Sequence, residues 1–207
     1  MNELELYREK TISNLILPDY LGMGYFTFLD DGLREPSKSE DRKLIAINYF
    51  KCLAMEIGIP FRKLSFFLKD EIAGGIDDIK GNGHIHFLLS FFGLEKIITE
   101  YNFQNGLDDY FYITNTILKR LARISRAKGL SKVSRYNYLK HGRSGINYTA
   151  KVSKRKWNEK KNCFNDDIIF SGIDYYSRAL EKEIDYRKQN NIFSSNLIEL
   201  NNLAFEF

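Results

Sequence analysis

Residues Leu64–Phe92 read LSFFLKDEIAGGIDDIKGNGHIHFLLSFF, and this stretch decides the fold that the sequence predicts. Its two ends, LSFFLKDEI and HIHFLLSFF, are rich in aromatic and apolar residues and have the length of strands. The segment between them is polar and rich in glycine, as the loops of hairpins are. We therefore expect two neighbouring antiparallel strands.

The segments on either side of this hairpin alternate between strand and helix patterns. Tyr20–Asp30, YLGMGYFTFLD, has the composition of a strand and runs into a turn. Apolar residues then recur at helical spacing from a capping serine, Ser37 or Ser39, up to Gly58. After the hairpin, the sequence predicts helices over Gly93–Tyr101 and Leu107–Arg126, a strand over Lys132–Lys140, and helices over Ile146–Trp157 and Gly172–Gln189.

This order of elements resembles a split βαβ arrangement. We expect an α+β fold of the ferredoxin-like or RRM-like kind, with one antiparallel sheet and helices packed on one of its faces. The strand that begins at His84 would be central, and the opposite face of the sheet would be open to a partner. A chain of 207 residues fits one domain, 1–165, with a C-terminal helical extension, 166–207, packed on it.

The composition is that of a globular protein, with 43% hydrophobic and 28% charged residues. No apolar run approaches the roughly 18 residues of a membrane span, and the N-terminal MNELELYREK lacks the apolar region of a signal peptide. The two cysteines, Cys52 and Cys163, predict neither a disulfide framework nor a thiolate zinc site. We expect a protein of the host cell's cytoplasm that makes no membrane contact.

Positive charge is concentrated in one segment of the chain. Residues 119–161 contain fifteen Lys and Arg residues and one acidic residue, in a chain whose net charge is +4. The rest of the chain is therefore acidic. A basic segment that also holds several tyrosines and Trp157 is typical of single-stranded nucleic-acid binding, in which cations contact phosphates and rings stack on bases. A solvated basic helix face is the alternative.

His84 and His86 point to the same face of their strand, because strand side chains alternate. Imidazole is the commonest transition-metal ligand, and a carboxylate from the neighbouring strand would complete a site. The hairpin register makes Glu71 the expected third ligand, whereas Asp70 takes its place if a bulge shifts the strand. The alternative is a half-buried polar pair at a strand end. His141, the third histidine, is expected at the surface or against DNA.

Three stretches complete the pattern in order: YFTFLD at 25–30, GHIHFLLSF at 83–91 and NYTAKVSK at 147–154. Over residues 20–157 the chain resembles the HUH endonucleases of the rolling-circle replication initiator type, in its FT strand, its His-hydrophobic-His strand and its Tyr-x-x-Lys helix. The resemblance implies an HUH nuclease fold, Mn²⁺ or Mg²⁺, and cleavage of single-stranded DNA at an origin hairpin or nick site of a plasmid or virus. It also implies a covalent link between the 5′ phosphate and a tyrosine.

Tyr148 is the expected nucleophile, because Lys151 follows it by one helical turn and the two side chains would share a face. Tyr138 is the competitor, but it lies in an expected strand and its spacing to the next lysine does not match the motif. Position 152 is valine, so this helix offers no second tyrosine. The residues expected to contact DNA belong to the same basic segment: Lys132, Arg135, Lys140, Arg143, Lys154, Arg155 and Lys156.

Two other functions fit parts of this pattern. A single-tyrosine HUH transposase uses the same chemistry, but its tyrosine is usually followed by a glutamine and its chain is usually shorter. A non-catalytic module for single-stranded nucleic acid would use the same sheet and basic segment without a metal ion. Thr27 and Phe28 of the first motif are expected in the core. No GxxxxGK[ST] motif occurs, so unwinding of DNA would need a separate helicase.

Overall fold

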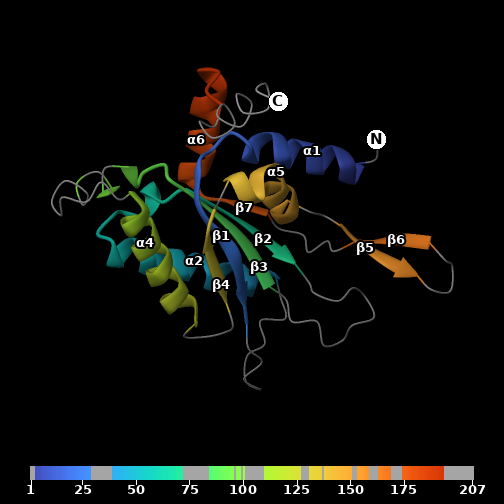
Figure 1. Ribbon diagram of the computed structural model, residues 1–207, viewed down its shortest axis with the longest axis horizontal. Helices are drawn as coiled ribbons and strands as arrows, with labels where there is room; N and C mark the ends of the chain where they lie inside the picture. Colours follow the sequence, from blue (N-terminus) through green and yellow to red (C-terminus); the bar gives the residue numbers. More distant parts are fainter. Residues whose placement is uncertain are drawn as a thin grey trace.

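The computed structural model describes residues 3–28, 39–71, 84–95, 97–98, 100, 110–126, 131–136, 138–150, 153–158, 163–168 and 174–193. For some of these, among them Glu71, His141 and the strands at 153–158 and 163–168, the description covers the backbone alone. A five-stranded antiparallel sheet in the order β4-β1-β3-β2-β7 lies between helices (Figure 1). The expected α+β class is confirmed.

The strands of this sheet are β1 Tyr20–Thr27, β2 Phe66–Glu71, β3 His84–Ser90, β4 Lys132–Arg135 and β7 Asp174–Tyr176. The helices are α1 Glu3–Leu15, α2 Ser39–Glu56, the short 3₁₀ helix η1 Phe61–Lys63, α4 Tyr110–Arg126, α5 Tyr138–Thr149 and α6 Arg178–Gln189. A separate two-stranded antiparallel sheet consists of β5 Ser153–Asn158 and β6 Cys163–Ile168 (Figure 1). As expected, the histidine strand β3 is central and pairs with β2.

One face of the sheet packs against α2 and α4. Alternate residues of β1, β2 and β3 point to this face and meet the apolar side of α2, forming an aromatic cluster. The rings of Phe50 and Phe66 stack with centroids 4.1 Å apart, and those of Phe26 and Phe87 stack at 4.7 Å. These large buried side chains supply most of the apolar area that stabilises the fold.

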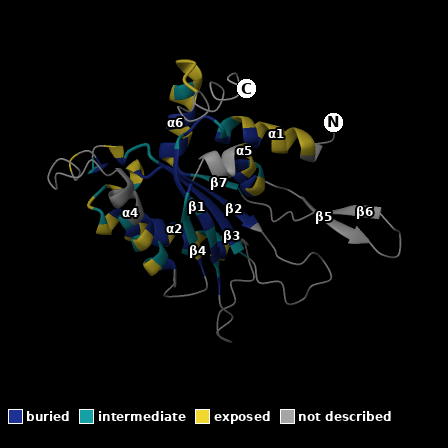
Figure 2. Ribbon diagram, viewed as in Figure 1, coloured by how far each residue is buried: buried dark blue, intermediate teal, exposed yellow. Residues whose placement is uncertain are grey.

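Helices also cover part of the other face, so the expectation of helices on one face alone is corrected. Phe67 and Leu88, which alternate with the residues of the first cluster, pack against side chains of α1, α5 and α6 such as Ile146 and Leu180. Figure 2 shows the sheet strands largely buried and the exposed residues on the outer sides of the helices. The physical reason lies in the strands, because both of their alternating sets include large apolar residues that must leave water.

The basic segment folds differently from its predicted pattern. β4 ends at Arg135 and α5 begins at Tyr138, so Tyr138 starts a helix instead of lying in a strand. The helix predicted over Ile146–Trp157 ends at Thr149, and Ser153–Asn158 form β5, which pairs with β6. Pairing with the strand that follows thus decides a segment whose helical spacing was ambiguous. Lys154, expected to contact DNA, therefore lies on a strand and not on the helix that carries Tyr148.

The two ends of the chain also add to the core. The tail predicted as one helix from Gly172 contains β7, which pairs with β2, before α6 begins at Arg178. The division expected between residues 165 and 166 falls inside β6. The N-terminal helix α1 was not predicted. Its sequence is mostly charged and polar, but Ile12 and Leu15 are buried against the sheet.

Gly24 of β1 allows β4 to approach closely. A Cβ atom at this position would collide with the carbonyl oxygen of Lys132 and would lie 2.9 Å from the ring of Phe87. Glycine inside a strand weakens it locally, and close approach of another backbone is the usual reason for it. Here it lets β4 pair with β1 so that Lys132 stands opposite Tyr25.

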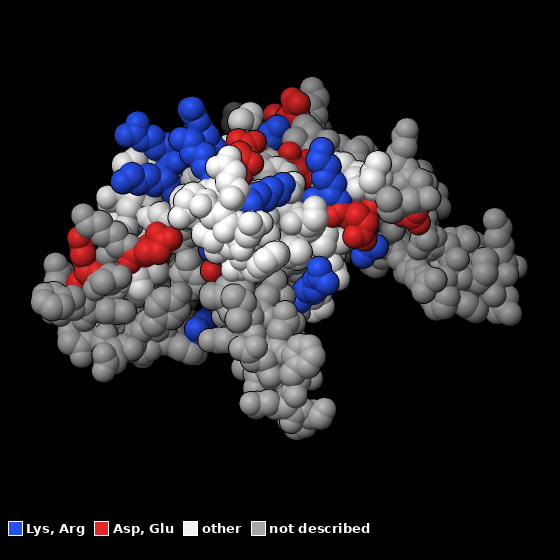
Figure 3. Space-filling model, turned by 90° about the horizontal axis from the view of Figure 1, so that it is seen from above, with Lys and Arg blue, Asp and Glu red and all other residues white. Residues whose placement is uncertain are grey.

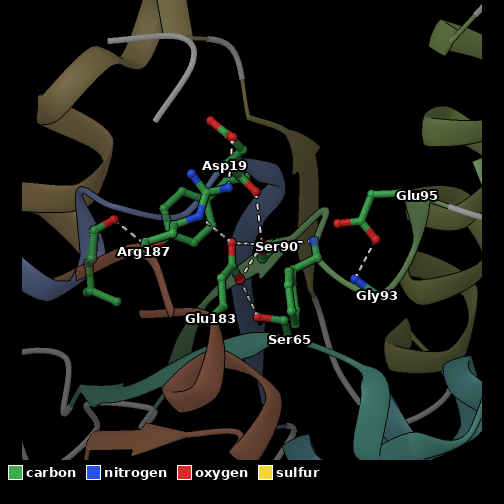
Figure 4. Close-up of polar contacts among 10 residues, drawn as sticks. Asp19, Ser65, Ser90, Gly93, Glu95, Glu183 and Arg187 are labelled. Atoms are coloured by element: carbon green, nitrogen blue, oxygen red, sulfur yellow. Dashed lines mark hydrogen bonds and ion pairs between the residues drawn. The ribbon is translucent and has the colours of Figure 1, made fainter. Parts of the chain in front are cut away.

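Glu183 of α6 is the centre of a buried polar network (Figure 4). Its side chain is fully buried, and Oε2 accepts hydrogen bonds from the hydroxyls of Ser65 at 2.8 Å and Ser90 at 2.9 Å. Arg187 Nε lies 3.2 Å from Oε1, and the same guanidinium also pairs with Asp19 at 3.0 Å. The network joins α6 to the start of β2 and the end of β3. Burial raises the pKa of Glu183 to about 7, against the opposing effects of both serines and Arg187.

Glu183 is expected to make stability depend on pH. A folded-state pKa of about 7 against 4.5 means that the folded protein holds a proton that the unfolded chain releases. Its contribution is therefore complete below about pH 4.5 and is lost as pH rises through about 7, by about 3 kcal/mol in all. Urea unfolding at about pH 5 and about pH 8 measures this, with Glu183→Gln as the control that cannot titrate. A stability difference between the two proteins that does not change with pH would contradict it.

Candidate metal and tyrosine site

His84 and His86 form a pair at one end of the central strand. Their Nε2 atoms lie 3.0 Å apart, and their ring centroids lie 4.7 Å apart. His86 is 2% exposed and His84 is half-buried. The predicted pair is therefore present, with the two Nε2 atoms next to one another.

This spacing fits a metal ion. At metal–nitrogen distances of about 2.1 Å, two ligands at a right angle have their nitrogens about 3.0 Å apart, which is one edge of an octahedron. The same separation also fits a hydrogen bond from one Nε2–H to the other Nε2. Two imidazoles alone suit transition ions such as Zn²⁺ or Fe²⁺, whereas Mn²⁺ or Mg²⁺ would also need carboxylate, phosphate or water oxygens at the remaining positions.

The β2–β3 register separates the two acidic candidates for a third ligand. Glu71 stands directly opposite His84 in the ladder, and residues opposite one another in an antiparallel pair belong to the same face of the sheet. Asp70 stands opposite Ile85, and its carboxylate pairs with the buried Arg42 of α2 at 2.5 Å on the other face. Asp70 is therefore held away from the histidines.

Tyr148 lies beside the histidine pair. Its ring centroid is 5.1 Å from that of His86 in an edge-on arrangement, and its side chain is 51% exposed. Ile146 and Ala150, which flank it in the sequence, are buried in the second core cluster and hold this end of α5 against the sheet. Tyr148 is thus an exposed tyrosine in ring contact with one of the two paired histidines. Lys151 lies outside the described residues.

Two residues of β1 complete the wall of the site, and sequence reasoning assigned neither of them to it. Tyr25 stands opposite His86, with its ring centroid 5.8 Å from His84 and 5.9 Å from His86. Thr27 stands opposite His84, and its buried Oγ1 has no hydrogen-bond partner among the described residues. Strand alternation in YFTFLD would have placed both on the histidine face once the β1–β3 register was known. Phe28 is in the core, as expected.

A buried charged cluster borders the site on the other side. Lys69 of β2 stands opposite His86, and its Nζ forms an ion pair with Asp174 of β7 at 2.6 Å, both side chains being less than a tenth exposed. Tyr7 of α1 donates a hydrogen bond to the same carboxylate. Burial and then Asp174 raise the pKa of Tyr7 above its ordinary value. This cluster links α1 and β7 to the histidine strand pair, and Asp174 balances the charge of the buried lysine.

The residues expected to contact DNA are divided among three elements. Lys132 and Arg135 lie on β4, and Arg143 is exposed on α5. The side chain of Lys140 lies outside the described residues, although its backbone belongs to α5. Figure 3 shows Lys and Arg side chains in separate groups with Asp and Glu between them, over the described part of the face it views.

The remaining three basic residues lie on β5. The register places Lys154 opposite Asp167, Arg155 opposite Asp166 and Lys156 opposite Asn165. Opposite charges across a ladder attract one another. Two of the three basic residues therefore stand opposite aspartates, which lowers the net positive charge that this ribbon offers to a phosphate.

The candidate metal site lies only partly within the described side chains. Among those side chains, no group of three or more His, Cys, Asp and Glu residues is placed to hold a metal ion. The third ligand position falls on Glu71, for which the backbone alone is described. Among the described helices, none has the length and apolarity needed to cross a membrane. Comparison of the chain with family models, curated proteins and solved structures finds no match.

Proposed function

We propose that the protein is a metal-dependent, single-tyrosine endonuclease and strand-transferase that nicks single-stranded DNA and starts rolling-circle replication of a plasmid or virus. The observation that carries the proposal is the convergence of His84, His86 and Tyr148, which come from two separate elements. A core histidine pair does not require an exposed tyrosine beside it. A module that only binds nucleic acid requires neither the histidine pair nor a tyrosine beside it.

In the proposed reaction Tyr148 Oη attacks the scissile phosphorus. The Oη–P bond forms as the bond from phosphorus to the 3′ oxygen breaks, so the phenol proton is lost and the leaving strand ends in a 3′ hydroxyl. His84, His86 and Glu71 would hold Mn²⁺ or Mg²⁺, which when bound polarises the phosphate and offsets its developing charge. The phosphotyrosine link is itself a phosphodiester bond that replaces the one broken in the DNA. A later 3′ hydroxyl can therefore attack it, reverse the step and join two strands.

The experiment is a covalent-adduct assay with a pool of labelled single-stranded oligonucleotides. With Mn²⁺ the protein is expected to form a protein–DNA adduct that survives denaturant, and with chelator it is expected to form none. His84→Ala is expected to lower the adduct yield at limiting Mn²⁺ by at least about 100-fold, because removing a ligand's hydrogen-bond partners alone costs about 10- to 100-fold in metal affinity. His141→Ala is the matched control.

The outcomes separate the proposal from its rivals. Binding of DNA that survives chelator, with no adduct from any oligonucleotide, would leave a non-catalytic single-strand-binding module. Adducts that join two strands only at the ends of a mobile element would favour a transposase of the same chemistry. Equal yields from His84→Ala and the unaltered protein would remove the histidine pair from the reaction.

A further inference from the structure

A groove separates α4 from the edge strand β4. It encloses about 610 Å³, within the range of ligand sites, and is lined by residues of these two elements. Leu118 and Val133 belong to its apolar lining, and both contact the first core cluster. Within the described chain, β4 pairs with β1 alone, so this groove follows one margin of the sheet.

The walls of the groove are basic. Lys119 and Arg123 lie one turn apart on α4, and Arg135 contributes from β4, whereas none of the described lining residues is acidic. Arg123 pairs with Glu56 at 2.6 Å, but its side chain is 71% exposed, and ion pairs of that kind contribute little. Cations on two facing walls fit a chain of phosphates better than they fit one compact anion.

The groove lies on the α4 side of the sheet and the histidines on its opposite face, and the edge strand β4 runs between the two. Lys132, at the start of β4, stands opposite Tyr25, which in turn stands opposite His86. Because β1 lies between β4 and β3, the backbone of Lys132 is two strand spacings, about 10 Å, from that of His86. Arg135 lies about 10 Å further along β4. A strand of DNA that crosses the margin of the sheet at Lys132 therefore enters the groove.

We propose that the α4–β4 groove binds the phosphodiester backbone of the single strand whose scissile phosphate lies at the histidine and tyrosine site. The inference rests on the proposed function and adds Lys119 and Arg123 of α4 to its DNA contacts. No aromatic residue is among those described in the lining, so the groove makes backbone contacts and does not stack bases. Binding there is independent of sequence, and its strength depends on salt.

The test is fluorescence anisotropy with labelled oligo(dT) of about 16 nucleotides, in chelator so that no cleavage occurs. Lys119→Glu is expected to weaken binding about tenfold. It is also expected to lower the slope of log affinity against log salt by about 0.7, which is the share of the slope that each neutralised phosphate of a single strand supplies. Lys182→Glu makes the same charge change at an exposed position of α6 and is expected to bind like the unaltered protein.

Equal binding by the two variants would overturn the groove assignment. So would displacement of the oligonucleotide by thymidine monophosphate at an equal phosphate concentration, which would mean a site for one phosphate. The Mn²⁺-dependent adduct, measured on the same preparations at saturating DNA, reports on the proposed function separately. It is expected to form with Lys182→Glu as with the unaltered protein, because Lys182 belongs neither to the groove nor to the candidate site.

Discussion

Tyr148→Phe is expected to form no covalent adduct with single-stranded DNA, while keeping its fold and its affinity for the strand. The variant removes one oxygen atom from a side chain that is 51% exposed, so it creates no cavity in the core. It leaves His84 and His86, the proposed metal ligands, in place. Because the phenol oxygen is the atom that we propose bonds to phosphorus, its removal is expected to abolish the adduct instead of slowing its formation.

The matched control for this prediction is Tyr186→Phe. Tyr186 lies on α6 and is 55% exposed. The control therefore makes the same chemical change at a similarly exposed tyrosine that lies on a different helix from Tyr148. The control is expected to give the adduct yield of the unaltered protein. If Tyr148→Phe still forms the adduct, the nucleophile is another tyrosine, and Tyr25 beside the histidines and Tyr138 at the start of α5 are the next to replace.

Asp70→Ala is expected to destabilise the protein by about 3 to 5 kcal/mol, because it leaves Arg42 buried without this carboxylate. The guanidinium donates two hydrogen bonds to it, from Nε at 2.8 Å and from Nη2 at 2.5 Å, and both side chains are at most 5% exposed. The free energy of unfolding from urea denaturation measures the effect. Mn²⁺ binding by the folded variant is expected to stay unchanged, since Asp70 lies on the opposite face from the histidines.

The double variant Arg42→Met, Asp70→Leu tests the reason for this destabilisation. Removing both charges together leaves no unpaired ion, so it is expected to cost less than Asp70→Ala alone. A small effect of Asp70→Ala on stability, or a large fall in Mn²⁺ binding by the folded variant, would contradict the structural role. The second result would instead make Asp70 a metal ligand.

The parts of the fold that alternation governs could be predicted from the sequence. Side chains alternate along a strand, and so the sequence alone placed His84 and His86 on one face of a central strand. The Glu71 register followed from a hairpin in which the end of one strand meets the start of the next. Tyr148 could be placed on a helix from the helical spacing of residues 146–157, although the helix that carries it is Tyr138–Thr149.

Strand pairing, and contacts between distant segments, decided what the sequence could not show. Ser153–Asn158 became a strand because Cys163–Ile168 pair with it. Lys69 resembles any surface lysine until Asp174, on an edge strand near the end of the chain, pairs with it in the interior. The α1 helix has too few apolar residues for its spacing to stand out, and its burial becomes apparent only from the sheet beneath it. Tyr25 joins the site only through the β1–β3 register.

The most direct test of the proposed reaction is to locate the DNA on the protein. The Mn²⁺-dependent adduct would be digested with protease and nuclease, and the peptide that carries the 5′ nucleotide would be sequenced by mass spectrometry. We expect the nucleotide on Tyr148 and a 3′ hydroxyl at the end of the released strand. A nucleotide on any other residue, or a cut strand with no nucleotide on the protein, would contradict the assignment of Tyr148 as the nucleophile.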